Sequence, residues 1–204
     1  MAKVTKFPKI VFDVDNVLAD SMTVFCQKVS SLVGFEVDKQ YIKNHKVVGS
    51  VPLTPRTIFK LQSQVWAEWE KLPALEHDLH KKMLAFRKIK FDIYVATAVP
   101  FRLAPYVKQW LKRMQVPYSE FFHCPEEESK SNISAEALVD DSPEEIRRSI
   151  RCGKLSFLYL QPWNKDIRIA KAITIKNLDD VLKYYGVRKG NNGIYRNARW
   201  SGRA

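Results

Sequence analysis

The 204-residue sequence has few cysteines, histidines and glycines, and it has no long apolar run. Its three cysteines, Cys26, Cys124 and Cys152, are widely spaced and form no CxxC pair. This indicates neither a zinc site nor a disulfide framework, so we expect reduced, mostly buried thiols. No apolar stretch approaches the roughly 18 residues of a membrane span. The N-terminal residues MAKVTKFPK contain no apolar signal segment, so we expect a cytoplasmic protein without a membrane partner.

Acidic residues are outnumbered by basic ones. The chain has 34 Lys and Arg against 22 Asp and Glu, which gives a net charge of +12 at pH 7. A positive surplus favours polyanionic partners, such as phosphorylated substrates, nucleic acid or acidic membrane surfaces. The alternative is that the charge serves solubility and gathers in a basic tail. Charge bears on association and leaves the fold open.

Apolar patterns of strand and helix type alternate along the chain. Strands are expected at 9–14, 91–99, 120–124, 137–140, 154–160 and 172–175. Helices are expected at 23–34, 54–72, 75–89 and 102–114, after Ser142, and at 177–186. This alternation predicts an α/β domain with a mainly parallel sheet.

The helical block between the first two strands is too long for a simple crossover, so we interpret it as an inserted helical cap. The expected organisation is a catalytic core at 1–19 and 89–186, a cap at 20–88 and a basic tail at 187–204.

Polar side chains stand at the ends of several predicted strands. Asp13 and Asp15 follow the first strand, Thr97 ends the second, and Asp140–Asp141 follows a later one, ten residues after Lys130. In an open parallel sheet, ligands bind beyond the carboxyl ends of the strands. Carboxylates are ligands that Mg²⁺ prefers, and lysine neutralises phosphate as a point charge. The set therefore predicts a Mg²⁺ and phosphate site.

Each of these residues alone has an ordinary structural explanation. A lone DxD is usually a solvated turn, and the joint order of the motifs favours a phosphoryl-transfer site. We expect Asp20 to cap the first inserted helix rather than to take part in catalysis. Trp66 and Trp69 are either core residues or base-stacking residues of the cap.

The stretch FDVDNVLAD at 12–20, together with Thr97, Lys130 and VDDSP at 139–143, resembles the four motifs of the haloacid dehalogenase (HAD) superfamily of phosphohydrolases. The closer resemblance is to the 5′(3′)-deoxyribonucleotidase family, which is also similar around QPWN at 161–164. It implies a HAD-like, Rossmann-type core with a cap, and a Mg²⁺-dependent phosphomonoesterase acting on nucleoside monophosphates. The alternatives are a nucleic-acid-end or sugar phosphatase of the same fold, and a binding subunit for nucleic acid or a protein assembly.

The resemblance also implies roles for single residues. Asp13 would be the nucleophile that forms an aspartyl-phosphate, and Asp15 the general acid and base. A turn at Val14 must then bring both carboxylates into the site. The metal ligands would be Asp13, the backbone carbonyl of Asp15 and Asp141, while Asp140 would bind through water or orient Lys130. The phosphate contacts would come from Thr97, the turn at Ala98, Lys130 and Arg102, the last touching either a second phosphate or the base.

The basic tail from Val187 onward carries five Arg and Lys residues and no acid. Its glycines and asparagines at 190–193 predict no regular element there. One interpretation is a solvated extension. The other is a segment that docks on a protein or on nucleic acid, because Tyr195 and Trp200 stand among the arginines and could stack on bases.

Overall fold

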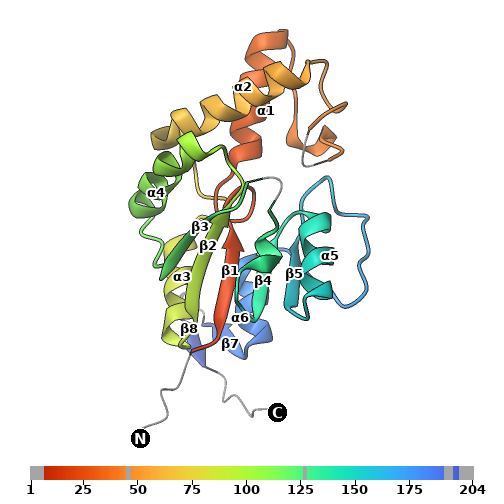
Figure 1. Ribbon diagram of the computed structural model, residues 1–204. Coiled ribbons are helices and arrows are strands. Elements are labelled where there is room, and N and C mark those ends of the chain that lie inside the picture. Colours follow the sequence, from red (N-terminus) through yellow and green to blue (C-terminus); the bar gives the residue numbers. More distant parts are fainter. Residues whose placement is uncertain (1–6, 45–46, 126–127, 191–194, 198–204) are drawn as a thin grey trace, which may run out of the picture.

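A six-stranded parallel sheet forms the centre of the computed structural model, which describes residues 7–44, 47–125, 128–190 and 195–197 (Figure 1). The strands lie in the order β3-β2-β1-β4-β5-β6, so β1 is central and the chain order reverses beside it. Their bounds are Lys9–Asp13 for β1, Asp92–Thr97 for β2, Glu120–His123 for β3, Ala137–Asp140 for β4, Leu155–Tyr159 for β5 and Ile173–Ile175 for β6. The predicted α/β class with a parallel sheet is confirmed.

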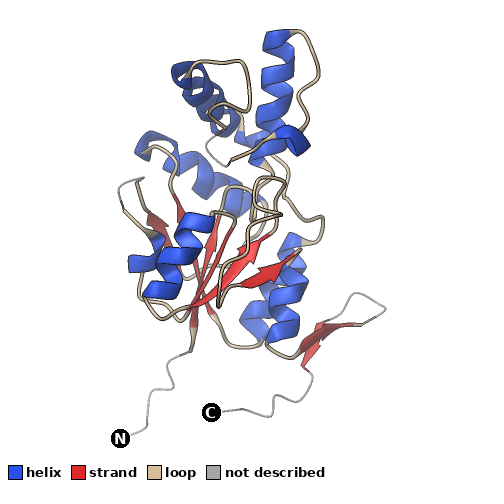
Figure 2. Cartoon of the chain, turned by 90° about the vertical axis from the view of Figure 1, so that its right-hand side faces the viewer, coloured by secondary structure: helices blue, strands red, loops and turns tan. Residues whose placement is uncertain are grey.

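Both faces of the sheet are covered, as Figure 2 shows. Along β1, Ile10 and Phe12 join the large core cluster, and Val11 points to a smaller cluster on the opposite face. The helices are α1 Ser21–Val33, α2 Pro55–Ala67, α3 Leu79–Lys88, α4 Ala104–Arg113, α5 Pro143–Arg151 and α6 Leu178–Tyr184. Within the described part of the chain, none of them has the length and apolar character that a bilayer span needs.

Local signals set several helix ends as predicted. The Thr54 hydroxyl accepts a hydrogen bond from the Thr57 backbone N–H at 3.3 Å and opens α2. The Ser142 hydroxyl accepts one from the Glu145 N–H at 3.4 Å and opens α5. Gly34, with φ of 79°, ends α1 in the left-handed conformation.

The inserted segment lies over the carboxyl edge of the sheet, with α1 and α2 at the top of Figure 1. Two backbone hydrogen bonds join the chain where it leaves and re-enters the core: Asp20 N–H to Pro73 O at 3.1 Å and Leu75 N–H to Leu18 O at 2.8 Å. The last helix of the predicted insertion, α3, does not lie with α1 and α2, because it packs on β2 and α6. The division into core and cap stays a prediction, and these contacts lead us to propose that α3 belongs with the core and that residues 21–71 form the cap.

The tail contains a short antiparallel hairpin of β7 Val187–Lys189 and β8 Tyr195–Asn197. The expectation of no regular element in the tail is wrong for these two strands, which pair in antiparallel register, and residues 191–194 lie outside the described residues. Lys189 pairs with Asp78, and the Tyr195 hydroxyl donates to Asp179 at 2.6 Å. These two side chains therefore bind the core, whereas Trp200 lies outside the described residues.

Candidate active site

Three buried carboxylates meet at the carboxyl edge of the sheet. Asp13 ends β1 and Asp140 ends β4, and these two strands pair in parallel, so their ends lie side by side. Ligand oxygens of Asp13, Asp140 and Asp141 all lie within 4.8 Å of one another. The structure thus brings together the aspartates that the motif spacing predicted.

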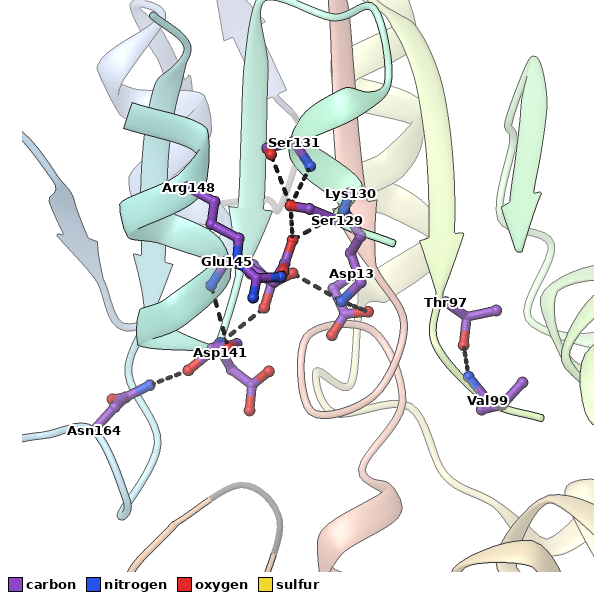
Figure 3. Close-up of polar contacts among 12 residues, drawn as sticks. Asp13, Thr97, Val99, Ser129, Lys130, Ser131, Asp141, Glu145, Arg148 and Asn164 are labelled. Carbon is purple, nitrogen blue, oxygen red and sulfur yellow. Dashed lines mark hydrogen bonds and ion pairs between the residues drawn. The ribbon is translucent and has the colours of Figure 1, made fainter. Parts of the chain in front are cut away.

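Lys130 points into this cluster from the short 3-10 helix η4, Lys130–Asn132 (Figure 3). Its Nζ lies 2.7 Å from Asp13 Oδ1 and 2.9 Å from Asp140 Oδ2. The Glu145 carboxylate fixes the loop, because its Oε2 accepts the Lys130 backbone N–H at 2.9 Å and the Ser129 hydroxyl at 2.7 Å. Lys130 is only 7% exposed, so it is a core residue rather than a solvated loop lysine.

The cluster carries an excess of buried negative charge. Burial, reinforced by the neighbouring carboxylates, raises the pKa of Asp13 well above its ordinary range and the pKa of Asp141 to about 8. Burial opposes the charged form of Lys130, but Asp13 and Asp140 raise its pKa all the same. One lysine therefore faces several carboxylates, and oxygen ligands with surplus negative charge suit a hard divalent cation. The residues present fit a metal site.

The two adjacent aspartates have different surroundings. Asp140 is fully buried, with Oδ2 on Lys130 and Oδ1 accepting the Ser142 backbone N–H at 2.8 Å. Asp141 accepts the Trp163 indole N–H at 3.0 Å on Oδ2, and both aspartates line the cavity described below. Among the described residues, Asp140 thus has a protein partner on each oxygen, and Asp141 has a hydrogen-bond partner on Oδ2 alone.

The QPWN segment after β5 holds this turn in place. The Asn164 amide donates to the backbone carbonyls of Asp141 at 2.7 Å and Tyr159 at 2.9 Å. The Gln161 amide donates to the Asn16 carbonyl at 2.7 Å and so reaches the loop after β1. This segment therefore joins the two loops that carry the aspartates. These hydrogen bonds explain why the polar residues Gln161 and Asn164 follow the buried strand β5.

The loop after β1 makes the predicted turn at Val14. The backbone N–H groups of Leu18 and Ala19 both donate to the Val14 carbonyl, at 3.0 and 2.9 Å, and Asn16 has φ of 60°. Asparagine tolerates this left-handed conformation better than most residues. The turn brings Asp15 to the cavity beside Asp13.

Asp20 precedes α1, but its side chain does not cap the helix. Its Oδ1 accepts the Thr23 hydroxyl and the Lys39 ammonium, both at 2.9 Å. The backbone N–H of Met22, in the first turn of α1, instead donates a hydrogen bond to Asn16 Oδ1 at 3.0 Å. Asp20 therefore stands at the N-cap position as expected, but the capping hydrogen bond expected of its side chain is supplied by the Asn16 amide oxygen instead.

The predicted phosphate-binding residues lie on the loop after β2. Thr97 is fully buried, and its hydroxyl accepts the Val99 N–H at 3.3 Å (Figure 3). Ala98 and Val99 line the cavity; among the described residues, its lining includes neither Thr97 nor Arg102. Arg102 is exposed and lies over the Phe59 ring at 5.7 Å. A phosphate contact from either side chain stays a prediction.

A cavity of about 630 Å³ opens above the aspartates, between the core and the cap. One face of α2 forms part of its wall, at the helical spacing i, i+3, i+4, i+7, with Phe59, Gln62, Ser63 and Trp66. Further apolar wall comes from Met22, Phe25, Val99 and Phe101, and His123 adds a polar ring. This wall was not predicted from the sequence, although the helical spacing of these four α2 residues indicates that they share one face.

A scan against models of protein families and a search of curated proteins found no match for this sequence. A search of solved structures found many similar folds. CbbY from Rhodobacter sphaeroides in complex with phosphate is 12% identical over 86% of this chain and 96% of that one, with a TM-score of 0.57. A predicted phosphoglycolate phosphatase from Haemophilus somnus is 16% identical over 89% and 99%, at 0.59. The HAD-hydrolase YfnB from Bacillus subtilis, bound to magnesium, is 13% identical over 88% and 99%, at 0.57.

The chain therefore has the HAD-like fold of these hydrolases over nearly their full length. The implied HAD-like, Rossmann-type architecture is confirmed, and its carboxyl edge carries an aspartate cluster that could hold a metal ion.

Proposed function

We propose that this protein is a Mg²⁺-dependent phosphomonoesterase. The observation that carries the proposal is the buried group of Asp13, Asp140 and Asp141, with Lys130 in contact with Asp13, at the base of a cavity. A phosphoryl group placed there would meet a nucleophile and a cation at once.

In the first step, a carboxylate oxygen of Asp13 attacks phosphorus and forms a new P–O bond. The bond to the alcohol oxygen breaks, and its electron pair stays on that oxygen, which takes a proton from Asp15. In the second step, water attacks phosphorus and gives a proton to Asp15. The P–O bond to Asp13 then breaks, its electron pair restores the carboxylate, and inorganic phosphate leaves.

Lys130 and the backbone N–H groups after Thr97 would hold the phosphoryl oxygens during both steps. When bound, Mg²⁺ supplies positive charge to the same oxygens. Asp13, the Asp15 carbonyl and Asp141 would hold it. Because both oxygens of Asp140 already have protein partners, we assign Asp140 to orienting Lys130.

For the substrate, we propose a nucleoside monophosphate, which makes the enzyme similar to a 5′(3′)-deoxyribonucleotidase. Two features support this proposal. A cavity of about 630 Å³ is within the range of small-ligand sites. Its wall contains the aromatic rings of Phe59, Phe101 and His123, which suit a flat base better than a sugar rich in hydroxyl groups.

The test is a phosphate-release assay of the purified protein with Mg²⁺. The panel contains deoxyribonucleoside and ribonucleoside monophosphates, sugar phosphates, and oligonucleotides phosphorylated at the 3′ or 5′ end. We expect turnover of mononucleotides and its loss in EDTA. Preference for sugar phosphates or oligonucleotide ends would contradict the nucleotidase proposal, and no release from any ester would contradict the phosphatase itself.

A further inference from the structure

A tryptophan of the cap reaches a carboxylate of the core. Trp66 lies in α2 and is 2% exposed, and its indole Nε1–H donates to Oδ1 of Asp15 at 3.0 Å. The two residues are 51 positions apart in the sequence. Sequence reasoning offered core packing or base stacking for this side chain, and the structure adds a hydrogen bond to the residue beside the nucleophile.

The indole is held firmly from its other side. It packs edge-on against Trp110 of α4, with ring centroids 6.2 Å apart and an interplanar angle of 86°. Trp110 in turn donates its Nε1–H to the Leu72 carbonyl at 2.8 Å, and Arg113 donates to the same carbonyl at 2.6 Å. A core helix and the returning cap segment therefore fix Trp66 together, so the position of its N–H is set before any substrate arrives.

An indole N–H donates and never accepts. The carbonyl oxygen of a protonated carboxyl accepts hydrogen bonds better than its hydroxyl oxygen, so the indole donor on Oδ1 favours the proton of Asp15 on Oδ2. A fixed carboxylate also loses the freedom to turn away from the reacting oxygen, which is the kind of orientation that accelerates proton transfer.

We propose that Trp66 is a positioning residue: its indole anchors Oδ1 of Asp15 so that Oδ2 faces the leaving-group oxygen. This inference rests on the proposed phosphatase function. It predicts that Trp66 affects the departure of poor leaving groups, which need a proton, more than the departure of good ones.

Trp66→Phe keeps a ring of similar size and removes the donor. Trp110→Phe is the matched control, because it removes another buried indole hydrogen bond, one that ends on a backbone carbonyl, and keeps an aromatic ring beside Trp66 and the hydrogen bond from Trp66 to Asp15. Both variants are assayed with phenyl phosphate and with 4-nitrophenyl phosphate, whose leaving group departs without protonation.

We expect Trp66→Phe to lower kcat about tenfold or more on phenyl phosphate with little change in KM, and to lower kcat far less on 4-nitrophenyl phosphate. Trp110→Phe should change both esters alike. Equal losses on the two esters for Trp66→Phe, or no loss, would overturn the positioning role.

A second measurement leaves Trp66 in place and needs no activity. In ¹⁵N-labelled protein, Asp15→Ala should shift the indole N–H resonance of Trp66 and leave that of Trp110 unchanged. An unchanged Trp66 resonance would overturn the inference even if the enzyme is active. Absence of turnover in the wild-type protein, with the Trp66 resonance shifted as expected, would instead contradict the proposed function alone.

Discussion

Replacing Lys130 with methionine should destabilise the protein as well as inactivate it. The ammonium is buried and contacts Asp13 at 2.7 Å and Asp140 at 2.9 Å. Loss of one partner of a buried ion pair typically costs about 3–5 kcal/mol, because an uncompensated charge remains. The lower end applies here, since the raised pKa of Asp13 allows it to take up a proton instead. We therefore expect about 3 kcal/mol lower free energy of unfolding in EDTA.

Magnesium should restore part of that stability without restoring turnover. A cation at one hundred times its dissociation constant stabilises the folded state by about 2.7 kcal/mol. Because Lys130→Met removes the positive charge that lies beside Asp13 and Asp140, Mg²⁺ meets less repulsion there and should stabilise this variant more than the wild type. Phosphate release should stay low, since the fixed positive charge on the phosphoryl group is missing.

Lys82→Met is the matched control. Lys82 is 5% exposed and pairs with Glu76, Asp78 and Asp179, none of which belongs to the aspartate cluster. Its loss should destabilise the fold by a similar amount in urea titrations, and Mg²⁺ should stabilise this variant only as much as the wild type. Equal Mg²⁺ effects on the two variants, or a loss below about 1 kcal/mol for Lys130→Met, would refute the proposed role of Lys130 in charge compensation.

Three further predictions concern the nucleophile, the metal and the tail. Asp13→Asn should lower turnover by roughly four to six orders of magnitude while keeping the fold, and near wild-type phosphate release would contradict its role. Without metal, the folded state holds the proton of Asp141 up to a pKa of about 8 against an ordinary 3.8, so stability should fall as pH rises through that interval. Mg²⁺ competes with this proton and should raise Tm more at pH 8 than at pH 6; equal shifts would argue against an aspartate site. Truncation after Gly186 removes the contacts of Lys189 and Tyr195 with the core, so it should lower unfolding free energy by about 1–3 kcal/mol in urea and leave hydrolysis intact. Unchanged stability would show that the hairpin contributes nothing to the core.

The sheet and the aspartate cluster could be predicted because their signals are local. Short apolar runs such as 137–140 mark buried strands, and a parallel sheet gathers the residues that follow them at one edge. Asp13 and Asp140–Asp141 therefore had to meet once their strands were adjacent. Ser142 likewise needed only its own neighbours to open α5.

The errors arose where distant residues decide the outcome. α3 has an amphipathic pattern that would suit a cap or a core, and its contacts with β2 and α6, which are distant in sequence, favour the core. The tail hairpin depends on Asp78 and Asp179, which lie far from it in sequence. Asp20 is an ordinary capping residue by type, and only the turn after β1 gives Asn16 the better position. Local patterns do not contain this information.

The cap reaches the site through two of its residues, and this divides the proposed chemistry between the two parts of the chain. Trp66 contacts Asp15 directly, and Lys39 lies 5.7 Å from the ring of Trp163, whose indole N–H binds Asp141. The core alone supplies the buried charge that would hold a metal and a phosphoryl group. The cap supplies part of the apolar cavity wall and the hydrogen bond to Asp15. Changes in the cap should therefore alter which leaving groups depart and how fast, while metal affinity should follow the core aspartates.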